Sequence, residues 1–162
     1  MGRTSGASDG LYDSDFLAWT SDQARRLRAL ARSGSNVDLD LAHLAEEVDD
    51  MGRSQIQAVE SLVANVIAHL LKIEHASASQ PHAHWRVEIA AWRGDIAARL
   101  DDSPSIRGRL DLERAYRRAA AIVRISLREH EGRMVDLPEL CPFALERILD
   151  QSWYPGAPTL PR

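Results

Sequence analysis

The sequence has little of several residue types, and each scarcity excludes a class of protein. It contains one cysteine, Cys141, so no intramolecular disulfide can form, and a reducing, cytoplasmic compartment is expected. No apolar run approaches the roughly 20 residues of a membrane span, so no membrane association is expected. The first ten residues are polar and lack the apolar segment of a secretory signal. Residues 1–10 and the proline-rich residues 156–162 are therefore predicted to be flexible tails.

Lysine is also nearly absent: the chain has 20 lysines and arginines together, and only Lys72 is lysine. A GC-rich genome, whose codons favour arginine and alanine, is the simplest interpretation. The formal net charge of −4 argues against a general nucleic-acid binder, because such proteins are usually strongly basic. With 162 residues, 44% of them hydrophobic, the chain is long enough for one domain with its own core, predicted over residues 11–155.

Strand patterns are missing as well. Apolar residues recur at the spacings of a helix, and no stretch alternates apolar and polar residues over the length of a strand. The pattern predicts an all-α fold, a compact bundle of about five or six helices. The first helix is expected to begin near Asp13 and to stop at residues 33–36. Further stops are predicted at residues 77–80, at Ser103-Pro104 and near Leu110.

The segment around Gly52 permits two interpretations. Gly52 can serve as the C-terminal cap of one helix, with Ser54 as the N-cap of the next. However, the apolar stripe keeps its helical phase through this junction, from Leu41 to Leu70. One long helix, kinked at Gly52, is therefore an equal alternative to two separate helices.

A polar cluster around Glu46 and Glu47 is the first candidate site. His43 and Glu47 are four residues apart and share one face of a helix. His69 lies on the apolar side of the following segment, where an imidazole needs a partner. If the two segments pack together, Glu47 can be that partner. The pair is then either structural or, with His43, part of an acid–base or divalent-metal site, although no Glu-x-x-His motif is present.

Two further features, a group of three histidines and the single cysteine, are weaker candidates for a functional site. His75, His82 and His84 are three nearby imidazoles that can hold zinc in principle, but their spacing matches no known ligand pattern. Cys141 precedes Pro142 at the predicted start of a last short helix, where the helix dipole would lower the pKa of the thiol. We expect exposed loop histidines and a helix-capping or buried cysteine.

An arginine-rich face is predicted on the helix that ends at Gly132. Such a face can contact phosphates or an acidic protein partner, but acidic neighbours dilute it and no aromatic residues interleave for base stacking. A solvated helix face is the simpler interpretation, and weak nucleic-acid contact stays an alternative. The five residues of this face are Arg114, Arg117, Arg118, Arg124 and Arg128.

Several segments together resemble one known family. The most specific are Met51-Gly52-Arg53-Ser54, which follows a Glu-Glu pair, and His69-Leu70-Leu71-Lys72. The other matching segments are 11–19, 39–48, 85–86, 102–105 and 141–142. In this order and spacing the chain resembles the bacterial domain-of-unknown-function family number twenty-nine. The resemblance implies an α-helical bacterial protein and brings no activity, substrate or cofactor. The family's characteristic polar positions correspond here to Glu46, Glu47, Arg53, His69 and Lys72.

The functional expectation is therefore a non-enzymatic interaction or regulatory protein. It rests on the absence of any catalytic motif and on a surplus of apolar helical surface. A homo-oligomer or another protein is the expected partner, and no cofactor is predicted. The main alternative is a metal-binding protein or metal-dependent hydrolase that uses His43, Glu47 and His69.

Overall fold

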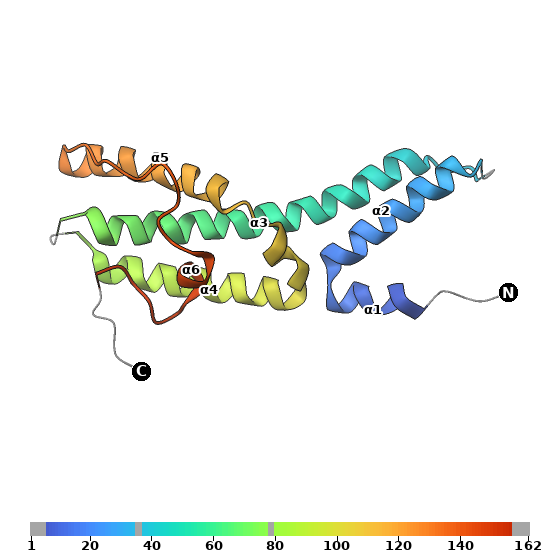
Figure 1. The fold of residues 1–162 in the computed structure, drawn as a ribbon, viewed down its shortest axis with the longest axis horizontal. Helices are drawn as coiled ribbons and strands as arrows, with labels where there is room; N and C mark the ends of the chain where they lie inside the picture. Colours follow the sequence, from blue (N-terminus) through green and yellow to red (C-terminus); the bar gives the residue numbers. More distant parts are fainter. Residues whose placement is uncertain (1–5, 35–36, 78–79, 157–162) are drawn as a thin grey trace. The chain divides into compact units, whose positions relative to one another are not determined.

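The structure, a computed structural model, describes residues 6–34, 37–77 and 80–156 (Figure 1). These residues form helices and contain no strand, which confirms the predicted all-α class. In chain order the helices are α1 (Gly6–Ser14), α2 (Phe16–Arg32), α3 (Leu41–His75), α4 (His82–Asp102), the 3-10 helix η1 (Pro104–Arg109), α5 (Leu112–Glu131) and α6 (Leu145–Leu149). The prediction of a flexible tail over residues 1–10 is wrong from Gly6 onward, because α1 begins there. Residues 1–5 and 157–162 lie outside the described part.

Two compact units make up the chain. The first comprises Met1–Ala58 and Ala98–Leu110, and the second comprises Val59–Ala97 and Asp111–Arg162. Neither unit is continuous in sequence, and α3 and α4 each contribute to both, so no single cut of the chain separates them. A single domain over residues 11–155 stays a prediction, and the two units are described separately.

In the first unit, Asp15 connects the start of α2 to η1. Its carboxylate caps α2 by accepting from the backbone N–H of Ala18 at 3.0 Å. The same carboxylate accepts from the backbone N–H of Ser105 at 3.0 Å and from its hydroxyl at 2.8 Å. One side chain thus satisfies donors at two helix starts that are far apart in the sequence.

Gly52 lies inside the continuous helix α3, so of the two alternatives one long helix is correct and two separate helices are wrong. The residue is buried, and a Cβ atom added to it would lie 2.5 Å from Thr20 Oγ1 and 3.0 Å from Leu17 Cδ1. Glycine is therefore required here because α2 packs directly onto the backbone of α3. The glycine marks a close helix contact and not a helix end.

Helix α3 is also the described helix that is long and apolar enough to cross a membrane. Of its most apolar window, 56% is buried inside the protein. Such burial is typical of a core helix in a soluble protein, so length and hydropathy by themselves are weak evidence for a span.

The second unit is built from the C-terminal part of α3, most of α4, α5 and α6. Its core contains fully buried aliphatic side chains from each of these helices, among them Ile67, Ile89, Val123 and Ile148. Helix α5 begins at the N-cap Asp111 and ends at Gly132, whose φ of 65° suits only glycine without strain. The predicted break near Leu110 and stop at Gly132 are confirmed.

The last helix begins later than predicted. Helix α6 starts at Leu145, with Ala144 at its N-cap, and residues 141 and 142 precede it in irregular structure. Cys141 is therefore not at a helix N-terminus, and the helix dipole does not act on its thiol.

Candidate functional site

His69, on α3, forms the centre of the main polar cluster in the second unit. Its side chain is 15% exposed, and its Nε2 lies 3.0 Å from Glu88 Oε2 on α4. Its Nδ1 lies 3.2 Å from the backbone oxygen of Asn65, one turn earlier. The imidazole meets Trp92 edge to face, with ring centroids 4.8 Å apart. A buried histidine with a carboxylate partner was predicted, but the partner is Glu88 and not Glu47.

The predicted pairing of Glu47 with His69 fails because both residues belong to one continuous helix. They are 22 positions apart (69 − 47), about 33 Å along a helix axis. Glu46 and Glu47 are exposed, and His43 makes an ion pair with Asp40 instead. In the described part of the chain, no group of three His, Cys, Asp or Glu residues has a metal-binding arrangement. The metal site proposed for His43, Glu47 and His69 is therefore wrong.

Burial and two neighbouring charges shift the pKa of His69. Burial lowers its pKa, nearby Lys72 lowers it further, and Glu88 raises it. Both ring nitrogens face acceptor oxygens, so only the imidazolium can donate to both at once. Glu88 Oε1 also lies 3.6 Å from His84 Nε2, on the preceding turn of its own helix. The cluster thus places one carboxylate between two histidines and beside the lysine.

Lys72 lies between this cluster and a cavity of about 200 Å³. Its ammonium is 5.7 Å from the centroid of the Trp85 ring, a cation–π contact. Burial lowers the pKa of Lys72, and the charge of Glu88 opposes that shift. Within the described residues, no carboxylate oxygen approaches the ammonium within 4.0 Å, the limit for an ion pair. Ser126, Leu127 and His130 of α5 line the same cavity.

The three histidines considered as possible zinc ligands do not come together at one site. They are His75, His82 and His84. His82 Nε2 donates to the backbone oxygen of Ser77 at 3.1 Å, and its ring stacks on Trp85 with ring centroids 5.3 Å apart. His84 faces Glu88, and His75 faces its neighbour Glu74. Each imidazole has its own partner, so the zinc interpretation of these residues has no geometric support.

Cys141 is half-buried, and burial raises the pKa of its thiol, opposite to the predicted direction. Its backbone N–H donates to the carboxylate of Glu113 at 3.1 Å, and its thiol donates to the backbone oxygen of Phe143 at 3.3 Å. The cysteine is consequently a structural residue of the segment between α5 and α6.

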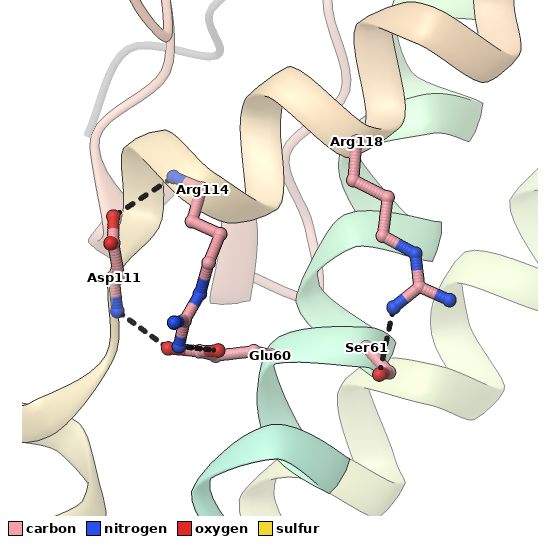
Figure 2. A network of polar contacts seen from close by, with 5 residues as sticks. All are labelled: Glu60, Ser61, Asp111, Arg114 and Arg118. Carbon is pink, nitrogen blue, oxygen red and sulfur yellow. Dashed lines mark hydrogen bonds and ion pairs between the residues drawn. The ribbon is translucent and has the colours of Figure 1, made fainter.

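The arginine-rich face of α5 is only partly free. Figure 2 shows Arg114 bonded to Glu60 of α3, and Arg118 donating to Ser61 Oγ at 3.1 Å. The buried Glu60 also accepts from the backbone N–H of Asp111 at 2.8 Å. Two of the five arginines therefore hold α5 against α3. Arg128 pairs with the adjacent Glu129, whereas Arg117 and Arg124 are exposed.

Arg93 is a buried charge that the sequence analysis did not single out. It is 1% exposed, and its Nε donates to the backbone oxygen of Ile148 at 2.7 Å. Its Nη2 donates to the backbone oxygen of Trp153 at 3.0 Å, and the guanidinium lies 5.1 Å from the Tyr154 ring centroid. Arg93 thus holds α6 and the C-terminal segment onto α4. In the sequence, Arg93 stands four residues after Ile89 and three before Ile96, and this helical spacing indicates that its side chain lies on the apolar face of α4.

An apolar stripe in the first unit is left uncovered. Leu44 and Met51 of α3 are 41% and 49% exposed, and Val48 between them is half-buried. Their spacing of four and three residues places them on one side of the helix. Leu30 of α2 and Leu39, which precedes α3, are exposed as well, at 41% and 61%. We call Leu44, Val48 and Met51 the α3 stripe.

Together, these features define an all-helical protein with a polar cluster in one unit and an exposed apolar stripe in the other. The chain belongs to the family described as Domain of unknown function DUF29, which matches residues 11–154. It is similar to an α-helical protein of unknown function from Rhodospirillum rubrum, known from a crystal structure. The two are 31% identical, the match covers 87% of this chain and 90% of that one, and the TM-score is 0.74. No curated protein matches the chain.

Proposed function

We propose that this protein is a non-enzymatic, cytoplasmic interaction protein that pairs with a second copy of itself through the α3 stripe. The observation that carries the proposal is the stripe itself, in which Leu44 and Met51 leave about half of their surface in water. A helical hairpin with an uncovered apolar seam gains free energy when a second seam covers it. The single cysteine is compatible with a reducing compartment.

The charges beside the stripe favour a second copy as the occupant. Helix α2 carries four arginines between residues 25 and 32, whereas α3 carries four acidic residues between 46 and 50. A two-fold interface brings the same patch together twice, so the basic helix of one copy can face the acidic helix of the other. Part of this charge is used within the unit, by the ion pairs of Arg25 and Arg26 with Asp22, of Arg28 with Asp49 and of Arg53 with Asp50. Arg32, Glu46 and Glu47 are exposed and form no ion pair among the described residues.

The test is sedimentation equilibrium of the full chain over a wide concentration range. The unaltered protein is expected to dimerise reversibly, and the double variant Leu44→Gln/Met51→Gln is expected to dimerise at least about tenfold more weakly. Each substitution occurs twice in a two-fold dimer, and burial of one such side chain is worth roughly 1.5–3 kcal/mol when complete. Glutamine preserves helix propensity, so circular dichroism should stay unchanged.

A matched control is available on α5. Ile122 and Ile125 are 44% and 57% exposed, close to the exposures in the α3 stripe, but lie in the second unit. The double variant Ile122→Gln/Ile125→Gln should dimerise like the unaltered protein. A strictly monomeric unaltered protein, or equal weakening by both double variants, would overturn the proposal.

A further inference from the structure

The cavity beside Lys72 has the composition of a small ligand site. Its lining includes the apolar residues Trp85 and Leu127. It also includes four residues with hydrogen-bonding side chains: Lys72, Gln80, Ser126 and His130. Pockets that bind small molecules combine a mostly apolar lining with a few placed polar groups in this way.

The charge of Lys72 points to an anion. This half-buried ammonium has no carboxylate within ion-pair distance among the described residues, because the nearby Glu88 is directed at His69 and His84. A partly desolvated cation that makes no direct ion pair is costly, and an anion that enters the cavity would offset that cost. The imidazole of His130 adds a second polar group: its Nδ1 donates to the backbone oxygen of Ser126 at 2.8 Å, and as the imidazolium it also donates through Nε2, which that bond does not occupy.

The choice of lysine at this position is itself informative. Every other basic side chain apart from histidine is arginine in this sequence. Lysine carries a compact charge on a flexible stem, whereas the guanidinium of arginine is larger and planar. In a cavity of about 200 Å³, an arginine would fill space that the lysine leaves open. A codon bias explains the arginines but not the one lysine at the mouth of a cavity.

We propose that this cavity binds a small organic anion, with a carboxylate against Lys72 and His130 and an apolar part against Trp85 and Leu127. The cavity is smaller than the roughly 300–1,000 Å³ typical of drug-sized ligands, so the ligand has the size of a small carboxylic acid. This site lies in the second unit and does not depend on the dimer proposed for the first.

The single lysine makes a residue-specific experiment possible on the unaltered full chain. Reductive methylation modifies amines, and here the only targets are Lys72 and the terminal α-amine. Peptide mass spectrometry separates the two. Benzoate, as a small aromatic carboxylate, is expected to slow methylation of Lys72 saturably and at least about fivefold, and to leave the α-amine rate unchanged.

Two other compounds test whether binding needs both the negative charge and the apolar part of the ligand. Benzamide has the same shape without the charge and should protect Lys72 at least about tenfold less effectively than benzoate. Inorganic phosphate tests whether charge alone is sufficient, and should also protect less well because it lacks an apolar part. Equal protection by benzamide, stronger protection by phosphate, no saturable effect of benzoate, or equal slowing at the α-amine would each overturn the proposal.

Variants provide an independent measurement by calorimetric titration with benzoate. Lys72→Met should weaken binding at least about tenfold. Arg128→Met removes a neighbouring exposed cation that does not line the cavity, and should bind benzoate like the unaltered chain. Unchanged binding by Lys72→Met would also contradict the proposal. The methylation experiment uses the unaltered protein and therefore does not depend on how these variants fold.

Discussion

At the scale of single residues, His69 shows how neighbouring charges set a proton equilibrium. Its imidazole should titrate below the ordinary value of 6.5, because burial and Lys72 oppose the charged form. Glu88→Gln should lower that pKa further, and Lys72→Met should raise it. Nuclear magnetic resonance titration of the imidazole protons measures each value, with His69→Gln to assign the signal. A titration of His69 above 6.5 in the unaltered protein would contradict this account.

The lowered pKa of His69 also makes the stability of the folded protein depend on pH. The folded protein binds the proton of His69 less tightly than the unfolded chain does, so acidification favours the unfolded chain. The contribution of His69 is therefore complete above pH 6.5 and declines as the pH falls from 6.5 toward the lowered pKa. Comparison of the unfolding free energy of the unaltered chain and His69→Gln at several pH values isolates this contribution from that of other groups.

Arg93 is the residue whose replacement should cost the most stability in the second unit. Arg93→Met keeps the apolar stem but leaves the backbone oxygens of Ile148 and Trp153 without their charged donor. We expect a loss of about 2–4 kcal/mol in the free energy of unfolding, measured by urea denaturation. Arg86 contacts the same Tyr154 ring from an exposed position, and Arg86→Met should cost less than about 1 kcal/mol. Similar losses for the two variants would show that the buried hydrogen bonds of Arg93 matter little.

At the scale of elements, the contact between α2 and α3 depends on Gly52, because this residue has no side chain. Gly52→Ala raises helix propensity by about 1 kcal/mol, but its Cβ would meet Thr20 Oγ1 at 2.5 Å. That hydroxyl donates to the backbone oxygen of Leu17 at 2.9 Å and cannot move without breaking this bond. Overpacking of this kind costs about 1–3 kcal/mol, so a net loss of stability is expected.

Gly94 of α4 supplies the matched control, because nothing lies within 4 Å of an added Cβ there. Gly94→Ala should therefore stabilise the protein by about 0.5–1 kcal/mol through helix propensity alone. Thermal denaturation of the two variants should give melting temperatures shifted in opposite directions. If Gly52→Ala also stabilised the protein, the close contact between α2 and α3 would be refuted.

At the scale of the whole molecule, the net charge of −4 hides an uneven distribution. In the first unit the basic residues gather on α2 and the acidic residues on the first part of α3. If opposite helices meet between two copies, self-association should weaken when salt is raised, because exposed charges are screened. Sedimentation equilibrium at low and high salt measures this effect. A dimer strengthened by salt would mean that only the apolar stripe acts, and that the charges do not select the partner.

Much of the local structure was predictable because its causes are local. Apolar spacing located the helices, Ser103-Pro104 marked the end of α4, and Gly132 marked the end of α5. The start of α6 was misplaced because a cysteine–proline pair suits both a helix start and the irregular segment before one. The helix in residues 6–14 was missed because its glycines and serines favour a tail by composition.

The sequence by itself determined the helical class, most helix ends and the family resemblance, because periodicity, capping and motif spacing are properties of neighbouring residues. Only the tertiary structure decided the partners of the polar residues. A side chain such as His69 can pair with any carboxylate that another helix brings near, and the continuity of α3 through Gly52 removed Glu47 and left Glu88. The same packing buried Arg93 and left Lys72 beside a cavity with no carboxylate oxygen within ion-pair distance among the described residues. Which helix faces meet depends on the whole chain, and that dependence cannot be read from spacing along one helix.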